Sequence, residues 1–397
     1  MRFFSRRLAA RFREFSKFKV VVVLGPRQSG KTTLVREFFS KHAYVNLEDP
    51  ETREFALADP RAFLKKHQHD NTQGIIIDEF QYAPNLLSYI QLIVDEKRRP
   101  GYFVLTGSQN FLMNQAITQS LAGRAGILTL LPLSIQEQID SKLISDDVSD
   151  VIIKGGYPGL YAEEVSPKAF FPSYIQTYVE RDVRQLINVE NLDKFHKFLR
   201  LCADRIGQIV NMADLAMQCG IDQRTANGWL SSLRSSYIIF LLQPYSKNYN
   251  KRIIKKPKMF FFDTGLASSL LGIRTKENFL LSPFRANLFE NFVVADFYKQ
   301  YYNLGINPSL YFWRDKNGRI EIDCIIDRAD KQIPVEIKSG ATINQSFFDA
   351  LTEWNKLAQA NPEDGYIVYS GNLRQSRSKG NVVGWQGACE LIEKVGV

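Results

Sequence analysis

The chain has 397 residues, of which 45% are hydrophobic and 12% aromatic, and its formal net charge is +9. This length suggests two or three domains at about 150 residues each, and no apolar run approaches the ~20 residues of a membrane-spanning helix, which excludes a transmembrane protein. The positive charge suggests a polyanionic partner such as DNA, although bound nucleotide would offset part of it.

The N-terminal segment and the cysteines both bear on the cellular compartment. The opening stretch MRFFSRRLAARFREF is basic and amphipathic, like a transit peptide, but it contains Glu14 and runs straight into a strand. We therefore interpret it as a packed helix. The scattered cysteines, without a C-x-x-C pair, argue against zinc and disulfides and for a reducing compartment. We expect a cytoplasmic protein.

A phosphate-binding loop follows the first predicted strand, Val20–Leu24. The next residues read GPRQSGKT, which fits the pattern G-x-x-x-x-G-K-[ST], and a helix is expected over Thr33–Phe39. Such a loop points backbone N–H groups at phosphate oxygens. Lys31 would reach the β- and γ-phosphates, and the Thr32 hydroxyl would bind Mg²⁺. The predicted nucleotide-binding residues are Gly25, Pro26, Arg27, Gln28, Ser29, Gly30, Lys31, Thr32 and Thr33.

Two acidic residues end another apolar run, in the segment GIIIDEFQ from Gly74 to Gln81. In P-loop NTPases an Asp at this place holds the Mg²⁺ shell, and the following Glu polarises the attacking water as a general base. These roles fall to Asp78 and Glu79. An apolar run before Asp-Glu is common by itself, but downstream of a phosphate-binding loop it fits a consistent context.

A third predicted strand, Tyr102–Thr106, ends in TGSQ. In this architecture such a strand lies between the other two and carries a polar residue that senses the γ-phosphate. Thr106 and Ser108 are the candidates. The alternative is a strand followed by an ordinary glycine turn.

The alternation of strand and helix patterns over residues 1–150 predicts an α/β domain. Its parallel sheet would carry helices on both faces. Ala43–Leu47 and Ile127–Leu131 are the two further strands expected in it. From about Val151 the strand pattern stops, and Tyr161–Leu201 is expected to be helical.

Residues 204–262 have the pattern of a winged helix. Helices are expected over Asn211–Cys219 and Gln223–Ser236, followed by strands over Tyr237–Leu242 and Met259–Phe262. The loop between these strands contains the basic residues Lys251, Arg252, Lys255, Lys256 and Lys258. Such a loop can lie along DNA phosphates as a wing. The alternative is a solvated hairpin, because winged helices also dock proteins.

Residues 283–397 return to a mixed α/β pattern. A helix is expected over Asn287–Tyr301, and an Asn-Gly turn joins the strands Tyr311–Arg314 and Arg319–Asp327. Gln332–Ser339 forms a third strand. Period-two alternation puts Glu321 and Asp323 on one face of the second strand, and it puts the following apolar residues on the other: Ile320, Ile322, Cys324 and Ile326.

This alternation allows Asp323 to converge with Glu336 and Lys338 of the third strand. Together they form the D…E-x-K constellation of a metal-dependent nuclease, in which two carboxylates hold a divalent ion, Mg²⁺ or Mn²⁺, and the lysine orients or deprotonates the attacking water. Glu290, on the preceding helix, is a candidate third acid. The alternative is a surface charge cluster, which any charged strand pair can form.

The chain resembles, nearly end to end, the prokaryotic AAA+-type ATPases that carry a C-terminal domain of unknown function with a restriction-endonuclease-like fold. The resemblance rests on GPRQSGKTTL (Gly25–Leu34), VNLEDPETREFALADPRAFL (Val45–Leu64), IIIDEFQ (Ile75–Gln81), LTGSQ (Leu105–Gln109), LAGRAG (Leu121–Gly126), LPLSIQE (Leu131–Glu137), GGYPGL (Gly155–Leu160), YVERDV (Tyr178–Val183), FFDTGLA (Phe261–Ala267), FEN (Phe289–Asn291), WRDKNGRIEID (Trp313–Asp323) and VEIKSG (Val335–Gly340).

The resemblance implies a P-loop domain over 1–150, a helical and winged-helix domain over 151–282 and a nuclease-like domain over 283–397. By analogy Lys31, Thr32, Asp78 and Glu79 take the nucleotide roles. Arg124 of LAGR is a candidate arginine finger or γ-phosphate sensor, acting in its own chain or in a neighbouring subunit.

We therefore expect a Mg²⁺-dependent ATPase whose hydrolysis changes how its C-terminal part engages DNA. Two alternatives stay open. One is an ATP-dependent nuclease that uses Asp323, Glu336 and Lys338. The other is an ATP-gated docking protein or regulatory switch, with a protein partner or a second copy of itself, whose nuclease-like domain is only a scaffold.

Overall fold

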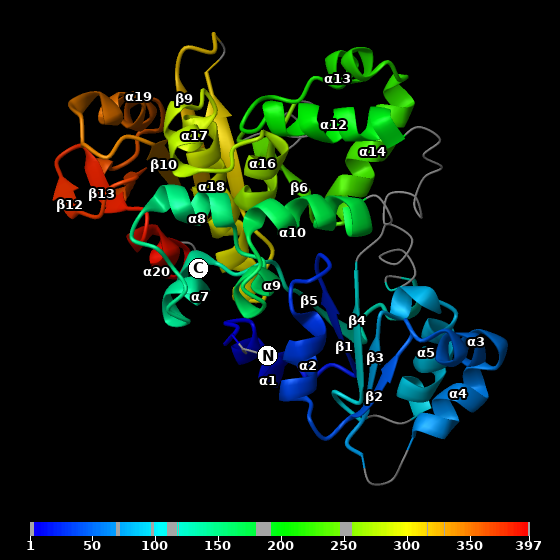
Figure 1. The fold of residues 1–397 in the computed structure, drawn as a ribbon. Coiled ribbons are helices and arrows are strands. Elements are labelled where there is room, and N and C mark those ends of the chain that lie inside the picture. Colours follow the sequence, from blue (N-terminus) through cyan, green and yellow to red (C-terminus); the bar gives the residue numbers. More distant parts are fainter. Residues whose placement is uncertain are drawn as a thin grey trace.

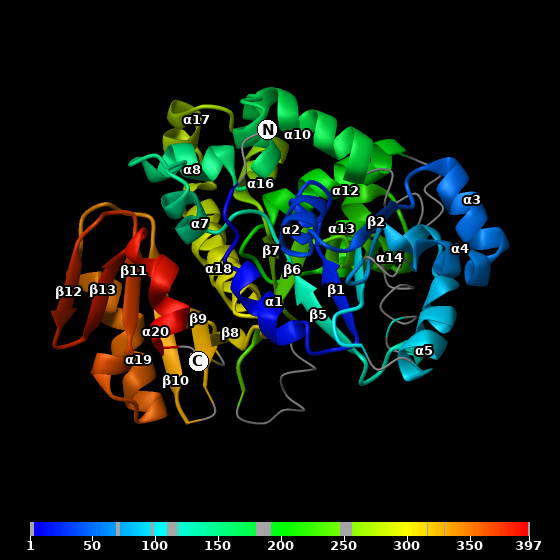
Figure 2. The same ribbon diagram turned by 90° about the horizontal axis from the view of Figure 1, so that it is seen from below.

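Two β-sheets organise the chain, as Figures 1 and 2 show. The computed structural model describes residues 4–68, 72–96, 99–108, 117, 119–179, 192–246, 256–315, 317–328 and 330–395. Within those residues the first sheet has five strands and the second has eight. No helix of this described part is both long and apolar enough to cross a membrane.

The first sheet is parallel and contains the strands on which the nucleotide prediction rests. Its strands are β1 (Val20–Leu24), β2 (Ala43–Asn46), β3 (Ile75–Asp78), β4 (Phe103–Gly107) and β5 (Ala125–Thr129). β4 lies between β1 and β3, as predicted, with β2 and β5 at the edges. β1 is apolar throughout because both faces of the sheet are covered. The predicted parallel α/β domain is confirmed.

Helices pack on both faces of this sheet (Figure 1). They are α1 (Ala9–Phe15) and α2 (Lys31–Phe38) on one face, with α3 (Pro50–Ala58), α4 (Pro60–His67), η1 (Phe80–Tyr82) and α5 (Leu86–Glu96) on the other. Phe12 of α1 packs against Val21 and Val23, so the predicted N-terminal helix is confirmed. Asp49 and Asp59 directly precede α3 and α4, and their carboxylates cap backbone N–H groups of the first turns.

Short helices follow the first sheet, and the described residues of Tyr161–Leu201, which the sequence predicts to be helical, are mostly helical. The helices are α7 (Ile135–Asp140), α8 (Val148–Lys154), α9 (Pro158–Ala162), α10 (Pro167–Tyr174), the π-helical turn η2 (Ile175–Val179) and α12 (Leu192–Asp204). The break after α9 coincides with Pro167, which begins a new helix because proline lacks the N–H needed to continue an old one.

Two helices joined by a tight turn come next, followed by a hairpin. They consist of α13 (Met212–Cys219), α14 (Gln223–Ser235), β6 (Ile239–Pro244) and β7 (Lys258–Phe261). Gly220 ends α13 in the left-handed conformation, and Asp222 caps α14. Of the predicted basic loop, Lys251, Arg252 and Lys255 lie outside the described residues. Lys256 is exposed, but Lys258 is buried, so the assignment of Lys258 to a solvated loop was wrong.

The second sheet continues from this hairpin into the C-terminal strands. Those are β8 (Leu310–Arg314), β9 (Glu321–Asp327), β10 (Gln332–Lys338), β11 (Tyr366–Tyr369), β12 (Arg374–Arg377) and β13 (Gly380–Gly384), in the order β12-β13-β11-β10-β9-β8-β6-β7. β6 joins β8 in parallel through Gln243 and Pro244. The strands of this sheet therefore lie on both sides of the domain boundary predicted at residue 282. The boundary itself stays a prediction.

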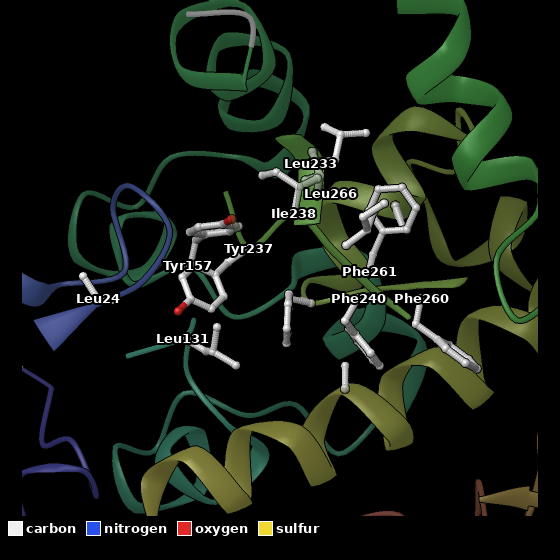
Figure 3. Packing of buried hydrophobic residues seen from close by; sticks show 14 of the residues in the cluster. Leu24, Leu131, Tyr157, Leu233, Tyr237, Ile238, Phe240, Phe260, Phe261 and Leu266 are labelled. Atoms are coloured by element: carbon white, nitrogen blue, oxygen red, sulfur yellow. The ribbon is translucent and has the colours of Figure 1, made fainter. Parts of the chain in front are cut away.

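Helices and turns surround this sheet. They are α16 (Thr264–Leu270), α17 (Lys276–Leu281), α18 (Arg285–Asn303), η3 (Gln345–Phe348), α19 (Asp349–Ala358), η4 (Pro362–Asp364), η5 (Gly387–Glu390) and α20 (Leu391–Val395). One continuous apolar cluster reaches from Leu24 of β1 through Tyr157 to Phe240 and Phe260 of the hairpin (Figure 3). The two sheets are thus connected by close-packed side chains, through which displacements can be transmitted.

Candidate functional site

The phosphate-binding loop closes between β1 and α2, and its glycines have backbone angles that other residues rarely adopt. The φ angle is 155° at Gly25 and 90° at Gly30. A Cβ at Gly25 would lie 2.1 Å from the carbonyl oxygen of Leu130, so there is no room for a side chain. α2 begins at Lys31 and directs its first N–H groups and its positive dipole end at the loop. This geometry suits a phosphate.

The side chains of the loop divide into two groups. Lys31 is buried, and its ammonium lies inside the loop, 2.8 and 3.1 Å from two loop carbonyl oxygens. Arg27 instead turns to Glu48, 3.3 Å away, and Gln28 donates to the hydroxyl of Tyr178 at 3.0 Å. The ammonium of Lys31 can therefore contact a phosphate, whereas Arg27 can contact one through its backbone N–H.

The carboxylate of Asp78 contacts two other predicted site residues, Thr32 and Thr106. Its Oδ2 accepts from the hydroxyl of Thr32 at 2.8 Å, and its Oδ1 accepts from the hydroxyl of Thr106. Tyr44 of β2 donates to the same Oδ2 at 2.8 Å. Thr32 and Asp78 present adjacent hard oxygen ligands, which is the donor set that suits Mg²⁺. No sequence pattern singled out Tyr44.

Glu79 follows directly in the left-handed conformation, with φ at 54°. Its Oε2 accepts from the amide of Gln81, and the same amide donates to the hydroxyl of Ser108 at 3.2 Å. The predicted base and one predicted sensor are thus joined through Gln81, whose role the sequence did not indicate. The Oε1 of Gln81 is buried and has no hydrogen-bond partner among the described residues.

A cavity of about 320 Å³ opens beside the loop. Its walls comprise Phe4, Arg6, Gln28, Gly30, Lys31, Thr32, Thr33, Leu34, Glu79, Pro158, Gly159, Ala162 and Glu163. Phe4, Pro158 and Ala162 offer an apolar surface suited to a nucleobase, opposite the polar loop. α9 therefore completes the site, although the segment GGYPGL carried no functional signal of its own.

A second cation supports the loop from the N-terminal segment. Arg6 is buried and forms an ion pair with Glu137 at 3.0 Å. It also donates to the carbonyl of Ser29 at 2.7 Å and to that of Leu131 at 2.6 Å. Because an unpaired buried charge is costly, the pair fixes the segment before α1 against the loop. The sequence offered no sign of this pairing, which joins residues far apart in the chain.

Three family models match successive parts of the chain. An AAA domain covers residues 17–139, a domain of unknown function (DUF8612) covers 145–277, and another (DUF4143) covers 285–386. The AAA model includes the phosphate-binding loop, Asp78, Glu79 and strand β4.

An uncharacterized protein of Mycobacterium tuberculosis is 30% identical over 378 residues, which is 93% of this chain and 80% of that protein. The chain belongs to the same family, and it is an ATPase. An uncharacterized protein of Haemophilus influenzae is 21% identical over 80% of this chain and 82% of that protein. A Walker-type ATPase structure from Pyrococcus abyssi shares 16% identity over 68% of this chain and 96% of that one, with a TM-score of 0.45.

Arg124, the candidate arginine finger, does not lie at the nucleotide site of its own chain in this ATPase. It directly precedes β5, and its carbonyl accepts from the N–H of Val20 at the start of β1. The loop follows the opposite end of β1. Arg124 also forms a bidentate pair with Asp95, at 2.7 and 2.8 Å. The prediction that Arg124 contacts the γ-phosphate of its own chain was therefore wrong. A role as arginine finger in a neighbouring subunit stays a prediction.

The C-terminal residues Asp323, Glu336 and Lys338 lie together, as predicted. Lys338 Nζ is 2.5 Å from Glu336 Oε2 and 4.0 Å from Asp323 Oδ2. Asp323 also accepts from the N–H of Ile337 at 2.8 Å. Burial, reinforced by the nearby Asp323, raises the pKa of Glu336 to about 8, although Lys338 opposes this.

The predicted alternation along β9 was wrong in one respect. Ile322 packs with Ile325 on the face covered by α19, whereas Cys324 and Ile326 face the other cluster. The pairing of β8 with β9 shifts register between Tyr311 and Trp313, which is a bulge. An inserted residue breaks the period of two and re-aims the neighbouring side chains.

Glu290 does not join Asp323 and Glu336 as a third ligand. It binds the ammonium of Lys258 at 3.0 Å, and Lys258 also pairs with Glu321. Among the described residues, no group of three or more His, Cys, Asp or Glu side chains is arranged to hold a metal ion. We call Glu290, Glu321, Asp323 and Glu336 the acidic cluster. The predicted second divalent ion is therefore unsupported.

Proposed function

We propose that this ATPase is a nucleotide-switched DNA-binding protein that contacts DNA through a winged helix. The solvent face of α14 carries the proposal. Its exposed residues are Gln223, Arg224, Asn227, Ser231 and Arg234. They recur at helical spacing on one face, while Trp229 and Leu233 are buried on the other. Arginine and amide side chains on the second helix of a helix-turn-helix are those that hydrogen-bond to base edges and phosphates.

The remaining residues of the switch are those of the nucleotide site. Bound Mg²⁺ would neutralise charge on the β- and γ-phosphates. Thr32 and Asp78 would hold the ion, Lys31 and the loop N–H groups would bind phosphate oxygens, and Glu79 would take a proton from the attacking water. The nucleobase would pack against Pro158 of α9. Residues of α9 belong to both the cavity and the apolar cluster. A displacement of α9 on loss of the nucleotide would therefore be transmitted through packed side chains to the hairpin.

The proposal is tested by fluorescence anisotropy with duplex DNA, in ATPγS and in ADP, over a series of salt concentrations. Arg224→Ala/Arg234→Ala should weaken binding and lower the log–log salt slope by about one for each lost phosphate contact. Arg374→Ala/Lys379→Ala removes the same charge from exposed positions far from α14 and should leave the slope unchanged. Equal effects of the two double variants would contradict the proposal and favour a helix-turn-helix that docks protein.

A metal-dependent nuclease is the second candidate function. It is favoured by the convergence of Asp323, Glu336 and Lys338, and by the Oε1 of Glu336, which is buried without a hydrogen-bond partner among the described residues. If it holds, the protein cleaves plasmid or branched DNA with Mg²⁺ or Mn²⁺, and Asp323→Ala abolishes cleavage while ATP turnover persists. If wild type and Asp323→Ala are equally inert, the domain is a scaffold.

A further inference from the structure

The edge strand β2 places a phenol against the carboxylate of Asp78. In the parallel pairing of β2 with β3, Asn46 is the register partner of Asp78. Tyr44 lies two residues earlier on β2 and shares this face of the sheet, because side chains alternate along a strand. Its hydroxyl donates to Oδ2 of Asp78 at 2.8 Å. Tyr44 therefore contacts a predicted Mg²⁺ ligand from outside the phosphate-binding loop.

The helix α2 also contacts the ring of Tyr44. Thr32 and Arg36 stand four residues apart on this helix and therefore on the same face of it. The hydroxyl of Thr32 donates to the same Oδ2 at 2.8 Å, and the guanidinium of Arg36 lies 4.6 Å from the centre of the Tyr44 ring. A guanidinium over an aromatic ring is attracted to it. The phenol is thus held by the helix that follows the loop as well as by its own strand.

Three hydroxyl groups donate to the two carboxylate oxygens of Asp78. Thr106 donates to Oδ1, whereas Thr32 and Tyr44 share Oδ2. Thr32 is also the loop residue whose hydroxyl oxygen would bind Mg²⁺, so its bond to Asp78 is the one that metal binding would change. The bonds from Thr106 and Tyr44 can persist, one on each oxygen. Because Asp78 is only 2% exposed, the orientation of its carboxylate depends on these two donors.

We propose that Tyr44 is a positioning residue for the Mg²⁺ of the ATPase reaction, because its hydroxyl holds the carboxylate of Asp78 in the orientation that binds the ion. A hydrogen bond to a metal-ligating group fixes its direction, and loss of such a bond typically lowers metal affinity or activity about 10–100-fold. Tyr44 does not line the nucleotide cavity that the described residues form. The inference concerns the metal requirement of the ATPase and does not depend on DNA binding.

The test compares nucleotide affinity with and without the metal ion, so that turnover is not needed. Full-length protein is titrated with the fluorescent, slowly hydrolysed analogue mant-ATPγS in Mg²⁺ and in EDTA. Tyr44→Phe should bind the analogue about tenfold more weakly than wild type in Mg²⁺ and equally well in EDTA. The Mg²⁺ concentration that gives half-maximal phosphate release from ATP should rise by a similar factor. Tyr366→Phe is the matched control, because it removes a hydroxyl from β11 in the second sheet and should change neither affinity.

Two results would overturn the inference. One is a Tyr44→Phe protein whose affinity for the analogue in Mg²⁺ equals that of wild type, because Thr32 and Thr106 would then suffice to hold the carboxylate. The other is an equal loss of affinity in Mg²⁺ and in EDTA, which would assign Tyr44 to the shape of the loop. Tyr44 is 36% exposed, and phenylalanine keeps the ring that Arg36 contacts, so the variant should fold. A variant that fails to fold counts against the inference equally, because the hydroxyl would then be structural.

Discussion

The backbone N–H of Gly156 donates to the Oδ2 of Asp263 at 2.7 Å, and this bond joins the nucleotide cavity to the hairpin. Gly156 lies two residues before Pro158, which lines the cavity. Asp263 follows β7 and caps α16 by accepting from the N–H of Leu266 at 3.0 Å. Any shift of α9 would therefore be passed to Asp263, two residues beyond the end of the hairpin strand β7.

The first prediction tests how tightly this junction is packed. Gly155 has φ at 72°, and a Cβ there would lie 2.4 Å from Asp263 Oδ1. Gly155→Ala should destabilise the protein by the cost of a positive φ combined with ψ at −166°, a region that only glycine readily adopts, about 1–3 kcal/mol, plus a clash of about 1–3 kcal/mol. Gly272→Ala is the control, since its φ is 73° and nothing lies within 4 Å of its Cβ. Equal losses in urea denaturation would show that the junction is loose.

The second prediction separates nucleotide binding from turnover. Lys31→Ala should abolish ATP binding, because the loop would lose the ammonium now held 2.8 Å from one of its carbonyls. Glu79→Gln should retain binding and lower kcat by about 10²–10⁴, since an amide cannot accept the proton of water. Calorimetric titration with ATP and a phosphate-release assay give the two readouts. Wild-type turnover in Glu79→Gln would exclude Glu79 as the base.

The third prediction concerns Gln81, which links Glu79 to Ser108. Gln81→Ala should lower kcat by about tenfold and leave KM for ATP unchanged, because it frees the base without touching the phosphate loop. Gln81→Glu keeps the size of the side chain but places a second negative charge beside Glu79, so it should shift the pH profile of kcat to higher pH. A change in KM alone would assign Gln81 to nucleotide binding instead.

Local patterns predicted the nucleotide site well because its geometry is set within short segments. A strand, a glycine loop and a helix leave little freedom, and parallel strands bring Thr32, Asp78 and Thr106 to one edge. Lys258 escaped prediction because its neighbours in sequence are basic, and only the pairing of β7 buries it. The bulge that re-aims the side chains of β9 depends equally on a partner strand.

The position of Arg124 illustrates a different limit. Its motif LAGR suggested a catalytic arginine by resemblance, but a residue just before a parallel strand lies at the end of the sheet opposite a loop that follows such a strand. Strand direction alone therefore placed Arg124 away from the phosphates of its own chain. Arg6 and the cavity wall at α9 depend on contacts across the fold, and no periodicity could reveal them.

The fourth prediction is a pH-dependent gain of stability in Glu336→Gln, measured by thermal unfolding with EDTA present. The pKa of Glu336 rises from 4.5 to about 8 on folding, mainly through burial. A raised carboxyl pKa means that folding favours the neutral form, so its stabilising effect is complete below pH 4.5 and is lost as the pH rises through about 8. Glutamine resembles the neutral form at every pH. The free energy of unfolding of the variant should therefore match that of wild type near pH 5 and exceed it by on the order of 1 kcal/mol or more at pH 9.

Glu353→Gln, at an exposed position paired with Lys356, should show no such trend. A variant less stable than wild type at pH 9 would mean that the ionised Glu336 is fully compensated by Lys338.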